Sequence, residues 1–453
     1  MKTPHIPYKP EQTLGQNSGS HADFILDTVV IGAGVSGLIA LKYLTSAGFN
    51  VVALEKAADV GGVWRQLPPW QDIQMSPEDW SINDVPIEGF DQKSILKNIG
   101  AFADQYNLRS FIRFQEQVQS LKRNNDMWVI QTNKGTVLAR TVVCSTGAHN
   151  DPFIPEITRR QSMVREFHSA RLMEPSILHG QRVVVVGGGT SAFDLIELAL
   201  QQKAQSIHWV YRSVRWMFPT TKTKQEKASL RQVAYQQMIG AKPEKLTAVY
   251  RKLLAEKYRF FGIEDILPER PFDYERDQLV PGRRDLIQNF KSLRRSRSEI
   301  QEISGNTVVL KSGEKIEADV VLYGTGYHMN LKYLGLPEFA TVKDSETLRG
   351  KCYGLMQAPN YPQLYFLGGT ALELNGVAPL NISMMARTLV SVIKGKCKLP
   401  QQPITQKINH WHLIQFFSRF DHTNYLPFFW RLKYFLLARH YLKHEKAQIR
   451  FDK

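Results

Sequence analysis

The sequence predicts an α/β protein built from two similar parallel-sheet domains, the second of which is inserted into the first. Two glycine-rich turns carry this prediction, because each directly follows an apolar run of the kind found in parallel strands that are buried on both faces. The first run begins at Val29 and the second at Val183. Each unit later reaches a strand that ends in Thr-Gly, at 144–147 and at 323–326, which indicates an internal repeat.

The first turn carries glycine at the three positions that a dinucleotide-binding turn requires. Gly32 permits the tight turn and Gly34 lets the backbone approach a pyrophosphate, whereas Gly37 lets the following helix pack closely on the strand. That helix, expected over 38–47, begins at the turn, so its free N–H groups face the phosphates. The next strand ends in Glu55, where a carboxylate can bind the ribose hydroxyls.

The second turn repeats this arrangement. Gly187 and Gly189 take the first two glycine roles, and Ala192 takes the third place, which the fingerprint allows. A helix is expected over 193–202, and the strand after it ends in Arg212. Because an arginine at this position binds a 2′-phosphate that an acid would repel, the second site is predicted to hold NADP. Both units are therefore interpreted as Rossmann-like dinucleotide-binding domains.

Composition narrows the classes of protein that fit this chain of 453 residues. Its three cysteines are far apart and include no CxxC pair, which counts against a disulfide reductase and favours a reducing, cytoplasmic compartment. No run of about 18 uncharged apolar residues occurs, so no transmembrane helix is expected. The net charge of +16 would suit nucleic acid or an anionic membrane. However, the densest basic run, 291–297, lacks aromatic residues that stack on bases and is interpreted as a solvated helix face, so no nucleic-acid partner is predicted.

Four motifs, in order over residues of about 25 to 395, resemble those of the flavin-containing monooxygenases, which are class B flavoprotein monooxygenases. They are Gly32-x-Gly34-x-x-Gly37, Gly61-Gly62-Val63-Trp64, Gly187-x-Gly189-x-Ser191-Ala192-x-Asp194 and Leu322-Tyr323-Gly324-Thr325-Gly326-Tyr327. The second motif is the most discriminating, because it follows Glu55 closely, where in this family it wraps the flavin. The resemblance implies FAD in the first domain and NADPH in the second.

The resemblance also assigns cofactor contacts residue by residue. For FAD they are Gly32, Gly34, Ser36, Gly37, Glu55 at the ribose, Gly62, Val63, Trp64 and Val118 at the adenine. For NADPH they are Gly187, Gly189, Thr190, Ser191 and Arg212, and the second Thr-Gly junction adds Thr325 and Gly326. The segment from Gly376 to Arg387 is expected to lie near the flavin ring.

The expected domain bounds follow from these motifs. They are a mobile tail at 1–22, the first part of the FAD-binding domain at 23–160, the NADP-binding domain at 161–318, the second part of the FAD-binding domain at 319–400, and an aromatic, basic helical segment at 401–453. Further elements are expected as an amphipathic helix over 93–107, a basic helical stretch within 222–260 and a hairpin over 307–316.

The family chemistry implies an oxidoreductase, namely an FAD- and NADPH-dependent monooxygenase. NADPH passes a hydride to FAD, and the reduced flavin takes up O2 as a C4a-hydroperoxide that oxygenates a nitrogen or sulfur nucleophile or a ketone. The cofactor carries this chemistry, so no side-chain nucleophile is required. Two alternatives share the cofactor motifs. One is an NADPH oxidase or flavin reductase without stable oxygen transfer, and the other is a non-catalytic regulatory protein that binds FAD and NADP.

Three departures from the family pattern bear on the site. Gln74 stands where the family has an Asn that faces the flavin; it can still donate an amide hydrogen bond, from one methylene further out, and is the catalytic candidate. His168 remains from a motif before the second turn, but Leu172 replaces its usual aromatic residue, so His168 is either functional or structural. Gly324 replaces the usual Ala, which is expected to be a mild change.

The segment 406–446 is rich in aromatic and basic residues. One interpretation is a helix on a membrane surface, with weak peripheral contact. The favoured one is packing over the FAD domain or a substrate tunnel, because aromatic residues at mixed spacing are more often in a core. His410 and His412 lack a third ligand at a suitable spacing, so no metal is predicted. The expected partners are O2 and a small-molecule substrate, and the oligomeric state stays open.

Overall fold

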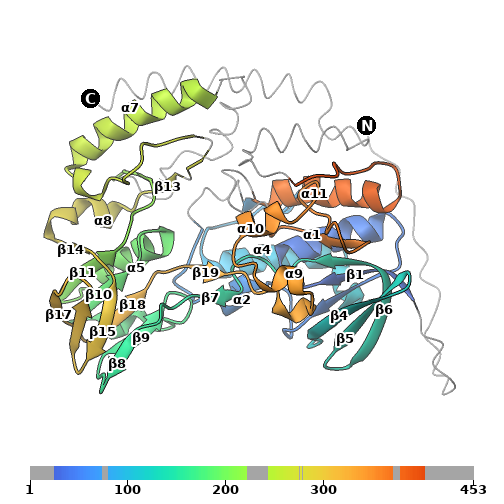
Figure 1. The fold of residues 1–453 in the computed structure, drawn as a ribbon, viewed down its shortest axis with the longest axis horizontal. Helices are drawn as coiled ribbons and strands as arrows, with labels where there is room; N and C mark the ends of the chain where they lie inside the picture. The colour runs from blue at the N-terminus through green and yellow to red at the C-terminus, as the bar shows by residue number, and fades with distance from the viewer. Residues whose placement is uncertain are drawn as a thin grey trace.

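The computed structural model describes residues 25–73, 80–221, 243–274, 276–277, 279–370 and 378–403. The expected tail at 1–22, the catalytic candidate Gln74 and the aromatic segment at 406–446 lie outside these residues. Figure 1 shows two lobes side by side, with connecting segments near the centre of the view.

The first lobe is built on a mixed sheet with the strand order β3-β2-β1-β6-β5-β4, and β20 pairs with β6. Its strands are β1 (Leu26–Ile31), β2 (Val51–Glu55), β3 (Ile112–Phe114), β4 (Val118–Asn124), β5 (Met127–Thr132), β6 (Gly135–Cys144) and β20 (Leu364–Phe366). The pairs β1–β2, β1–β6 and β6–β20 are parallel. Because β20 follows the second lobe in the chain, its pairing confirms that the chain returns to the first.

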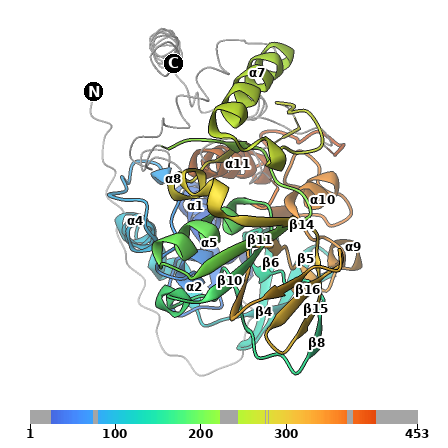
Figure 2. The ribbon, with the colours of Figure 1, turned by 90° about the vertical axis from the view of Figure 1, so that its left-hand side faces the viewer.

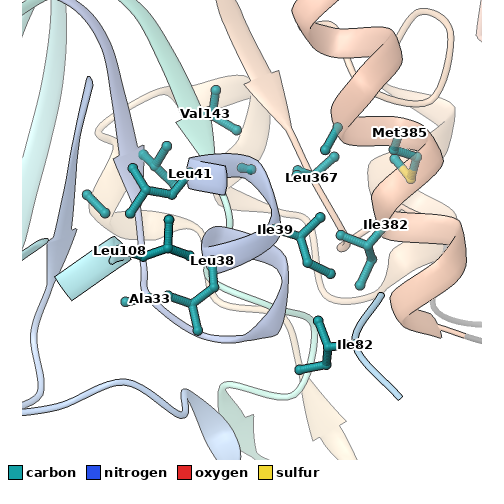
Figure 3. Close-up of a cluster of buried hydrophobic side chains, with 14 of the residues drawn as sticks. Ala33, Leu38, Ile39, Leu41, Ile82, Leu108, Val143, Leu367, Ile382 and Met385 are labelled. Carbon is teal, nitrogen blue, oxygen red and sulfur yellow. The ribbon is translucent and has the colours of Figure 1, made fainter. Parts of the chain in front are cut away.

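One face of this sheet is covered by helices from both parts of the chain. They are α1 (Val35–Ser46), α4 (Gln92–Gln105) and α11 (Ala378–Ile393). The helices expected after the first turn and over 93–107 are thus confirmed. Between α1 and α11, the buried side chains of Ile39 and Ile382 face each other (Figure 3). This packing holds the N-terminus of α1 in place at the carboxyl edge of the sheet.

The opposite face of the first sheet has its own core. Val29, Ile31 and Val142 pack there against Trp128 of β5 and against the short helices α9 (Pro337–Ala340) and α10 (Ser345–Gly350). Both faces of the central strands are therefore buried, which is why these strands are nearly continuous apolar runs in the sequence.

The second lobe is built on a parallel sheet with the strand order β14-β11-β10-β18-β9. Its strands are β9 (Arg165–His168), β10 (Arg182–Val186), β11 (Ser206–Tyr211), β14 (Arg294–Arg297) and β18 (Val320–Tyr323). The central position of β10, between β11 and β18, places the second glycine turn at the carboxyl edge of this sheet, as expected for a Rossmann-like domain.

Alternate residues of β10 serve two separate cores. Val183 and Val185 pack with α5 (Thr190–Gln201), whereas Val184 and Val186 pack with a smaller sheet. That sheet has the order β17-β16-β15-β8 and consists of β8 (Thr158–Arg160), β15 (Ile300–Ser304), β16 (Thr307–Leu310) and β17 (Lys315–Glu317). The antiparallel pair β16–β17 confirms the predicted hairpin. Figure 2 shows α5 on one side of β10 and β11 and the smaller sheet on the other.

The remaining elements of the second lobe include α7 (Pro243–Phe261), α8 (Arg284–Gln288), β12 (Met217–Phe218) and β13 (Val280–Pro281). Helix α7 confirms the described part of the basic helical stretch, and 222–242 lie outside the described residues. In the part of the chain that the structure describes, no helix combines the length and the apolarity needed to cross a bilayer.

The two lobes are joined by paired connectors. The outgoing strand β7 (Asp151–Pro152) and the returning strand β19 (Tyr327–His328) are antiparallel partners, and the rings of Phe153 and His328 lie 4.4 Å apart. This pairing defines where one domain ends and the other begins. It corrects the expected boundaries at 160/161 and 318/319, because β8 pairs with β15 and β18 pairs with β10 inside the second lobe.

The basic run at 291–297 is a further correction. It was interpreted as a helix face, but Arg294–Arg297 forms β14, the edge strand that pairs in parallel with β11. Its charges are balanced by carboxylates of a neighbouring loop: Arg295 contacts Asp265 at 2.8 Å and Arg297 contacts Glu269 at 3.4 Å. The pairing and these ion pairs outweigh the local helical pattern, since strand formation depends on tertiary context.

The replacement of Ala by Gly324 is also not the mild change that was expected. A Cβ atom at Gly324 would lie 2.5 Å from both the N and the Cα of Ala192 at the start of α5. The position therefore requires glycine in this chain. Ala192 occupies the third place of the glycine fingerprint, and its backbone approaches the second Thr-Gly junction so closely that the facing residue has no room for a side chain.

Candidate functional site

The first glycine turn is shaped by contacts that exclude side chains. Gly32 has a φ of +99°, and a Cβ atom at Gly37 would lie 1.9 Å from the carbonyl oxygen of Gly32. Both glycines are therefore required for α1 to begin against the end of β1, as the sequence predicts.

The Gly61–Trp64 motif packs directly on this turn. The Gly61 N–H donates to the Ala33 carbonyl at 3.2 Å, and a Cβ atom at Gly62 would lie 2.9 Å from the Cα of Gly34. The motif then continues into the short helix α2 (Val63–Gln66). Two glycine-containing segments, far apart in the sequence, thus meet backbone to backbone. Their contact brings together two backbone segments without side chains, where a ligand with a pyrophosphate could approach.

Trp64 extends the same surface. Its half-buried ring lies edge-on to Trp80, with ring centroids 5.6 Å apart. The carbonyl of Trp64 accepts a hydrogen bond of 2.8 Å from Nε2 of Gln92, at the start of α4. Val63 precedes Trp64 at the first position of α2. The aromatic pair is held in place beside the glycine turn, where a flat ring system could pack.

Glu55 ends β2 with its carboxylate already oriented. The side chain is buried, and its oxygens accept from the Ala33 N–H at 2.7 Å and the Ala57 N–H at 2.8 Å. A carboxylate has further lone pairs, so these bonds orient the group without saturating it, and ribose hydroxyls could still bind. Val118 begins β4 nearby, two residues after Glu116, whose N–H donates to the Glu55 carbonyl at 2.9 Å.

Ser36 lies where the second part of the first domain closes on α1. A Cβ atom at Gly368, in the turn after β20, would lie 2.1 Å from Oγ of Ser36. The turn after β20 therefore contacts the first turn of α1. The segment expected to close over the flavin begins beyond it, and residues 371–377 lie outside the described residues.

The N-termini of helices α1 and α5 differ from those of α4 and α10. Each begins after a fingerprint glycine, Gly34 or Gly189, and in the described structure neither has a side-chain cap or an acid in its first turn. By contrast, Asp91 caps α4 and Asp344 caps α10 through hydrogen bonds to backbone N–H groups. An uncapped helix N-terminus presents unpaired donors and the positive end of the helix dipole, which suits a phosphate.

The second turn has the same shape as the first. Gly187 has a φ of +129°, and a Cβ atom there would lie 2.3 Å from the carbonyl oxygen of Gly324. At Gly189, however, a Cβ atom would meet only the Arg215 side chain, at 3.6 Å. Thr190 and Ser191 follow as the first residues of α5. Packing in the described structure therefore does not require glycine at position 189, and its contact with a ligand stays a prediction.

Two arginines flank the second turn. Arg212, as predicted, leaves the end of β11 with a side chain that is 76% exposed, and its Nη1 lies 3.3 Å from Oε1 of Glu299. Sequence reasoning missed Arg215. Its side chain lies beside the turn, because a Cβ atom at Gly189 would be 3.6 Å from it. The sequence feature that could have revealed Arg215 is its place as a second basic residue three positions after Arg212. Two positive groups therefore lie beside the second turn, and Glu299 forms an ion pair with Arg212.

An ion pair that the sequence did not reveal holds α5, the helix that follows the second turn. Nε of the buried Arg283 donates to Oδ1 of Asp194 at 2.6 Å. Asp194 belongs to the motif on α5, and Arg283 precedes α8, 89 residues later. Their contact fixes α5 relative to α8, and no local pattern in the sequence relates the two positions.

The second Thr-Gly junction serves the connection between the lobes. Oγ1 of Thr325 donates to the carbonyl of Phe153 on the outgoing connector. The contacts of His168 favour a structural role. Its Nε2–H donates to the Gly326 carbonyl at 2.9 Å, and its Nδ1 accepts from the Ala170 N–H at 3.1 Å. Burial lowers the pKa of His168 from its ordinary value, which favours this neutral form.

His149 and Tyr327 form an aromatic pair at the connectors, with ring centroids 5.3 Å apart. Desolvation, with a smaller effect of Arg215, lowers the pKa of His149. Burial raises the pKa of Tyr327. Both rings are therefore uncharged near neutral pH, on the side of the connectors that faces Arg215.

The geometry defines a protein with two dinucleotide-type sites, each at the carboxyl edge of a parallel sheet. Known proteins agree. The family model for pyridine nucleotide-disulphide oxidoreductases matches residues 29–253. A Baeyer-Villiger monooxygenase of Streptomyces coelicolor is 26% identical over 437 residues, which cover 85% of this chain and 82% of that protein. Dimethylaniline monooxygenase [N-oxide-forming] 2 of Mus musculus is 26% identical over 418 residues, covering 83% and 74%.

Solved structures show the same fold. The complex of OTEMO with FAD and NADP has a TM-score of 0.66 at 19% identity and covers 82% of this chain and 84% of its own. Oxidized steroid monooxygenase bound to NADP has a TM-score of 0.64 at 20% identity, with 82% and 85% covered. Together with the motifs and the two-domain fold, these likenesses support a class B flavoprotein monooxygenase.

Proposed function

We propose that the chain is an NADPH-dependent flavoprotein monooxygenase that holds FAD in the first domain and NADPH in the second. The observation that carries this proposal is the pair of uncapped helices, α1 and α5, which begin directly after Gly34 and Gly189. Each offers unpaired N–H groups at a place without side chains, which fits a pyrophosphate. The relatives named monooxygenases and the neighbours solved with FAD and NADP support the same assignment.

The residues of the chain hold and orient the two cofactors. Gly34 and Gly62 form the cradle for the FAD pyrophosphate, and Glu55 holds the ribose hydroxyls. Arg215 and Arg212 attract the phosphates of NADPH. When bound, FAD would supply the redox chemistry for an overall reaction in which NADPH and O2 are consumed, one oxygen atom enters the substrate and the other leaves as water.

The substrate class follows from this chemistry and from the relatives. A nitrogen or sulfur nucleophile or a ketone is proposed as the substrate, because the relatives include N-oxide-forming enzymes and a Baeyer-Villiger enzyme. Gln74 stays a prediction for the residue that faces the flavin. A cytoplasmic location is also proposed, since Cys144, Cys352 and Cys397 are all free thiols. Weak membrane contact through 406–446 remains a prediction as well.

A test of the function mixes the flavin-loaded protein with NADPH without oxygen, and then with O2 and a panel of amines, sulfides and ketones. We expect NADPH to bleach the flavin and O2 to restore its colour, with one oxygenated product formed per NADPH consumed. Hydrogen peroxide in place of product with every substrate would favour an NADPH oxidase. Failure of NADPH to bleach the flavin would favour a non-catalytic regulatory protein.

Arg212→Ala tests whether the second site recognises the 2′-phosphate. A hydrogen bond to a charged group contributes about 1.5–3 kcal/mol, and the exposure of Arg212 favours the lower end, so we expect NADPH to bind roughly tenfold more weakly. NADH, which lacks the phosphate, should be affected little. The measurement is the KM and Kd for both nucleotides, and equal losses for both would contradict a 2′-phosphate site.

Glu299→Gln is the matched variant, because it removes the carboxylate that competes for Arg212. An exposed ion pair contributes about 0–1 kcal/mol, so NADPH affinity should rise by up to about fivefold, in the opposite direction to Arg212→Ala.

A further inference from the structure

A short segment of the first domain reaches across to the second. Trp70 and Gln71 follow the Gly61–Trp64 motif, and their side chains donate to backbone carbonyls beyond the connectors. Nε1 of Trp70 donates to Leu172 at 2.6 Å, and Nε2 of Gln71 donates to Ser169 at 2.9 Å. The ring of Trp70 also packs against the hydrophobic core of the second domain. A first-domain residue thus completes the edge of the second domain's core.

The segment is firmly anchored in its own domain. The Ile73 N–H donates to the Phe90 carbonyl at 2.9 Å, and the Gln92 N–H donates to the Gln71 carbonyl at 3.1 Å. The Gln92 side chain holds the carbonyls of Trp64 and Leu67, at 2.8 and 3.3 Å. A single residue at the start of α4 therefore ties the motif beside the first site to the segment that contacts the second domain.

The receiving turn at 169–172 is equally well held. It follows β9, the strand beside β18, and the Ala170 N–H donates to Nδ1 of His168. His168 in turn donates to Gly326 at the second Thr-Gly junction. Leu172, which stands where an aromatic residue is usual in the family pattern, is fully buried in the hydrophobic cluster against which Trp70 packs. The receiving turn is thus connected to the end of the strand beside the second glycine turn.

We propose that Trp70 and Gln71 form an interdomain latch that sets the separation of the two nucleotide sites, and that they are positioning residues for hydride transfer. The proposal rests on the proposed function, in which NADPH must approach the flavin. Hydride donor and acceptor react when they lie roughly 3–3.5 Å apart, and a misplacement of about 1 Å costs on the order of a hundredfold in rate. A latch that joins the backbone beside one site to the backbone beside the other controls this distance without touching either cofactor.

Trp70→Ala removes both the hydrogen bond and the ring that fills the second core. In the flavin-loaded variant we expect flavin reduction by NADPH to slow by at least about tenfold, from loss of positioning. The FAD content and the Kd for NADPH should stay within about threefold of the wild type. Flavin reduction at the wild-type rate in this variant would contradict the proposal. Gln71→Leu removes the second hydrogen bond but keeps the Trp70 ring, and it tests the same point if Trp70→Ala does not fold.

A second readout does not depend on activity. Small-angle X-ray scattering and amide exchange at 169–172 should report a broader distribution of interdomain distances and faster exchange in Trp70→Ala. Unchanged scattering and exchange would overturn the latch even if the rate fell. If the wild type itself is not reduced by NADPH, the proposed function fails, whereas these two measurements still test the latch.

Trp128→Phe is the matched control. Nε1 of Trp128 donates to the Pro362 carbonyl at 3.0 Å, so this variant loses the same type of hydrogen bond within one domain. It should lower the unfolding temperature and leave the reduction rate and the interdomain distances unchanged. An equal slowing in Trp128→Phe would overturn the proposal, because it would trace the effect to stability alone.

Discussion

Replacing Gly34 with valine should give a folded protein without flavin. The backbone of Gly34 suits any residue, but a Cβ atom there would already lie 3.4 Å from the Cα of Gly62, and the branched methyl groups would fill the cradle between the two segments. Overpacking costs about 1–3 kcal/mol, and loss of a charge-assisted hydrogen bond adds about 1.5–3 kcal/mol. We therefore expect FAD affinity to fall by roughly a hundredfold or more.

The measurement is the visible absorbance of the purified variant, followed by titration of the flavin-free protein with FAD. Circular dichroism confirms that the variant is folded. Gly350→Ala is the control, since a Cβ atom at this helical position meets nothing within 4 Å, and it should retain its flavin. A yellow Gly34→Val variant with a full complement of FAD would contradict the assignment of the first site.

Replacing Gly189 with alanine should impair NADPH binding while FAD binding and stability remain intact. The added Cβ atom makes only an ordinary contact with Arg215, so the free protein has no reason to resist it. A bound pyrophosphate, in contrast, needs the space that the methyl group takes. Loss of one hydrogen bond to a charged group corresponds to about 1.5–3 kcal/mol, so the Kd for NADPH should rise at least about tenfold.

Gly187→Ala provides the contrast, because a Cβ atom there would collide with the carbonyl of Gly324. That variant should unfold at a lower temperature, whereas Gly189→Ala should not. Fluorescence titration with NADPH and thermal unfolding distinguish the two effects. Unchanged NADPH affinity in Gly189→Ala would argue against a pyrophosphate at this turn.

Local patterns were sufficient for the central elements of the fold. The apolar runs at Val29 and Val183 are central parallel strands, because strands that are buried on both faces tolerate few polar residues. The glycines at 32, 37 and 187 occupy positions where a side chain would collide with backbone atoms, which is the physical origin of the fingerprint. The uncapped starts of α1 and α5 follow directly from that fingerprint.

Local sequence patterns gave wrong predictions where the structure depends on residues that are distant in the chain. The basic run at 294–297 became an edge strand because β11 and the carboxylates of Asp265 and Glu269 lie beside it. The domain boundaries shifted because β8 and β18 find their partners in the second lobe. Gly324 proved indispensable because the backbone of Ala192 approaches it, a contact that one residue in isolation cannot reveal.

The sequence by itself determined that two glycine turns follow two buried strands, and that an acid or an arginine ends the next strand. These features are local, and each depends on residues within one strand, turn and helix. Only the tertiary structure decided that Gly62 meets Gly34, that Arg215 and Glu299 flank the second site, and that Trp70 enters the core of the other domain. Such contacts join residues that are distant in the chain, and they depend on how the two sheets and their connectors pack together.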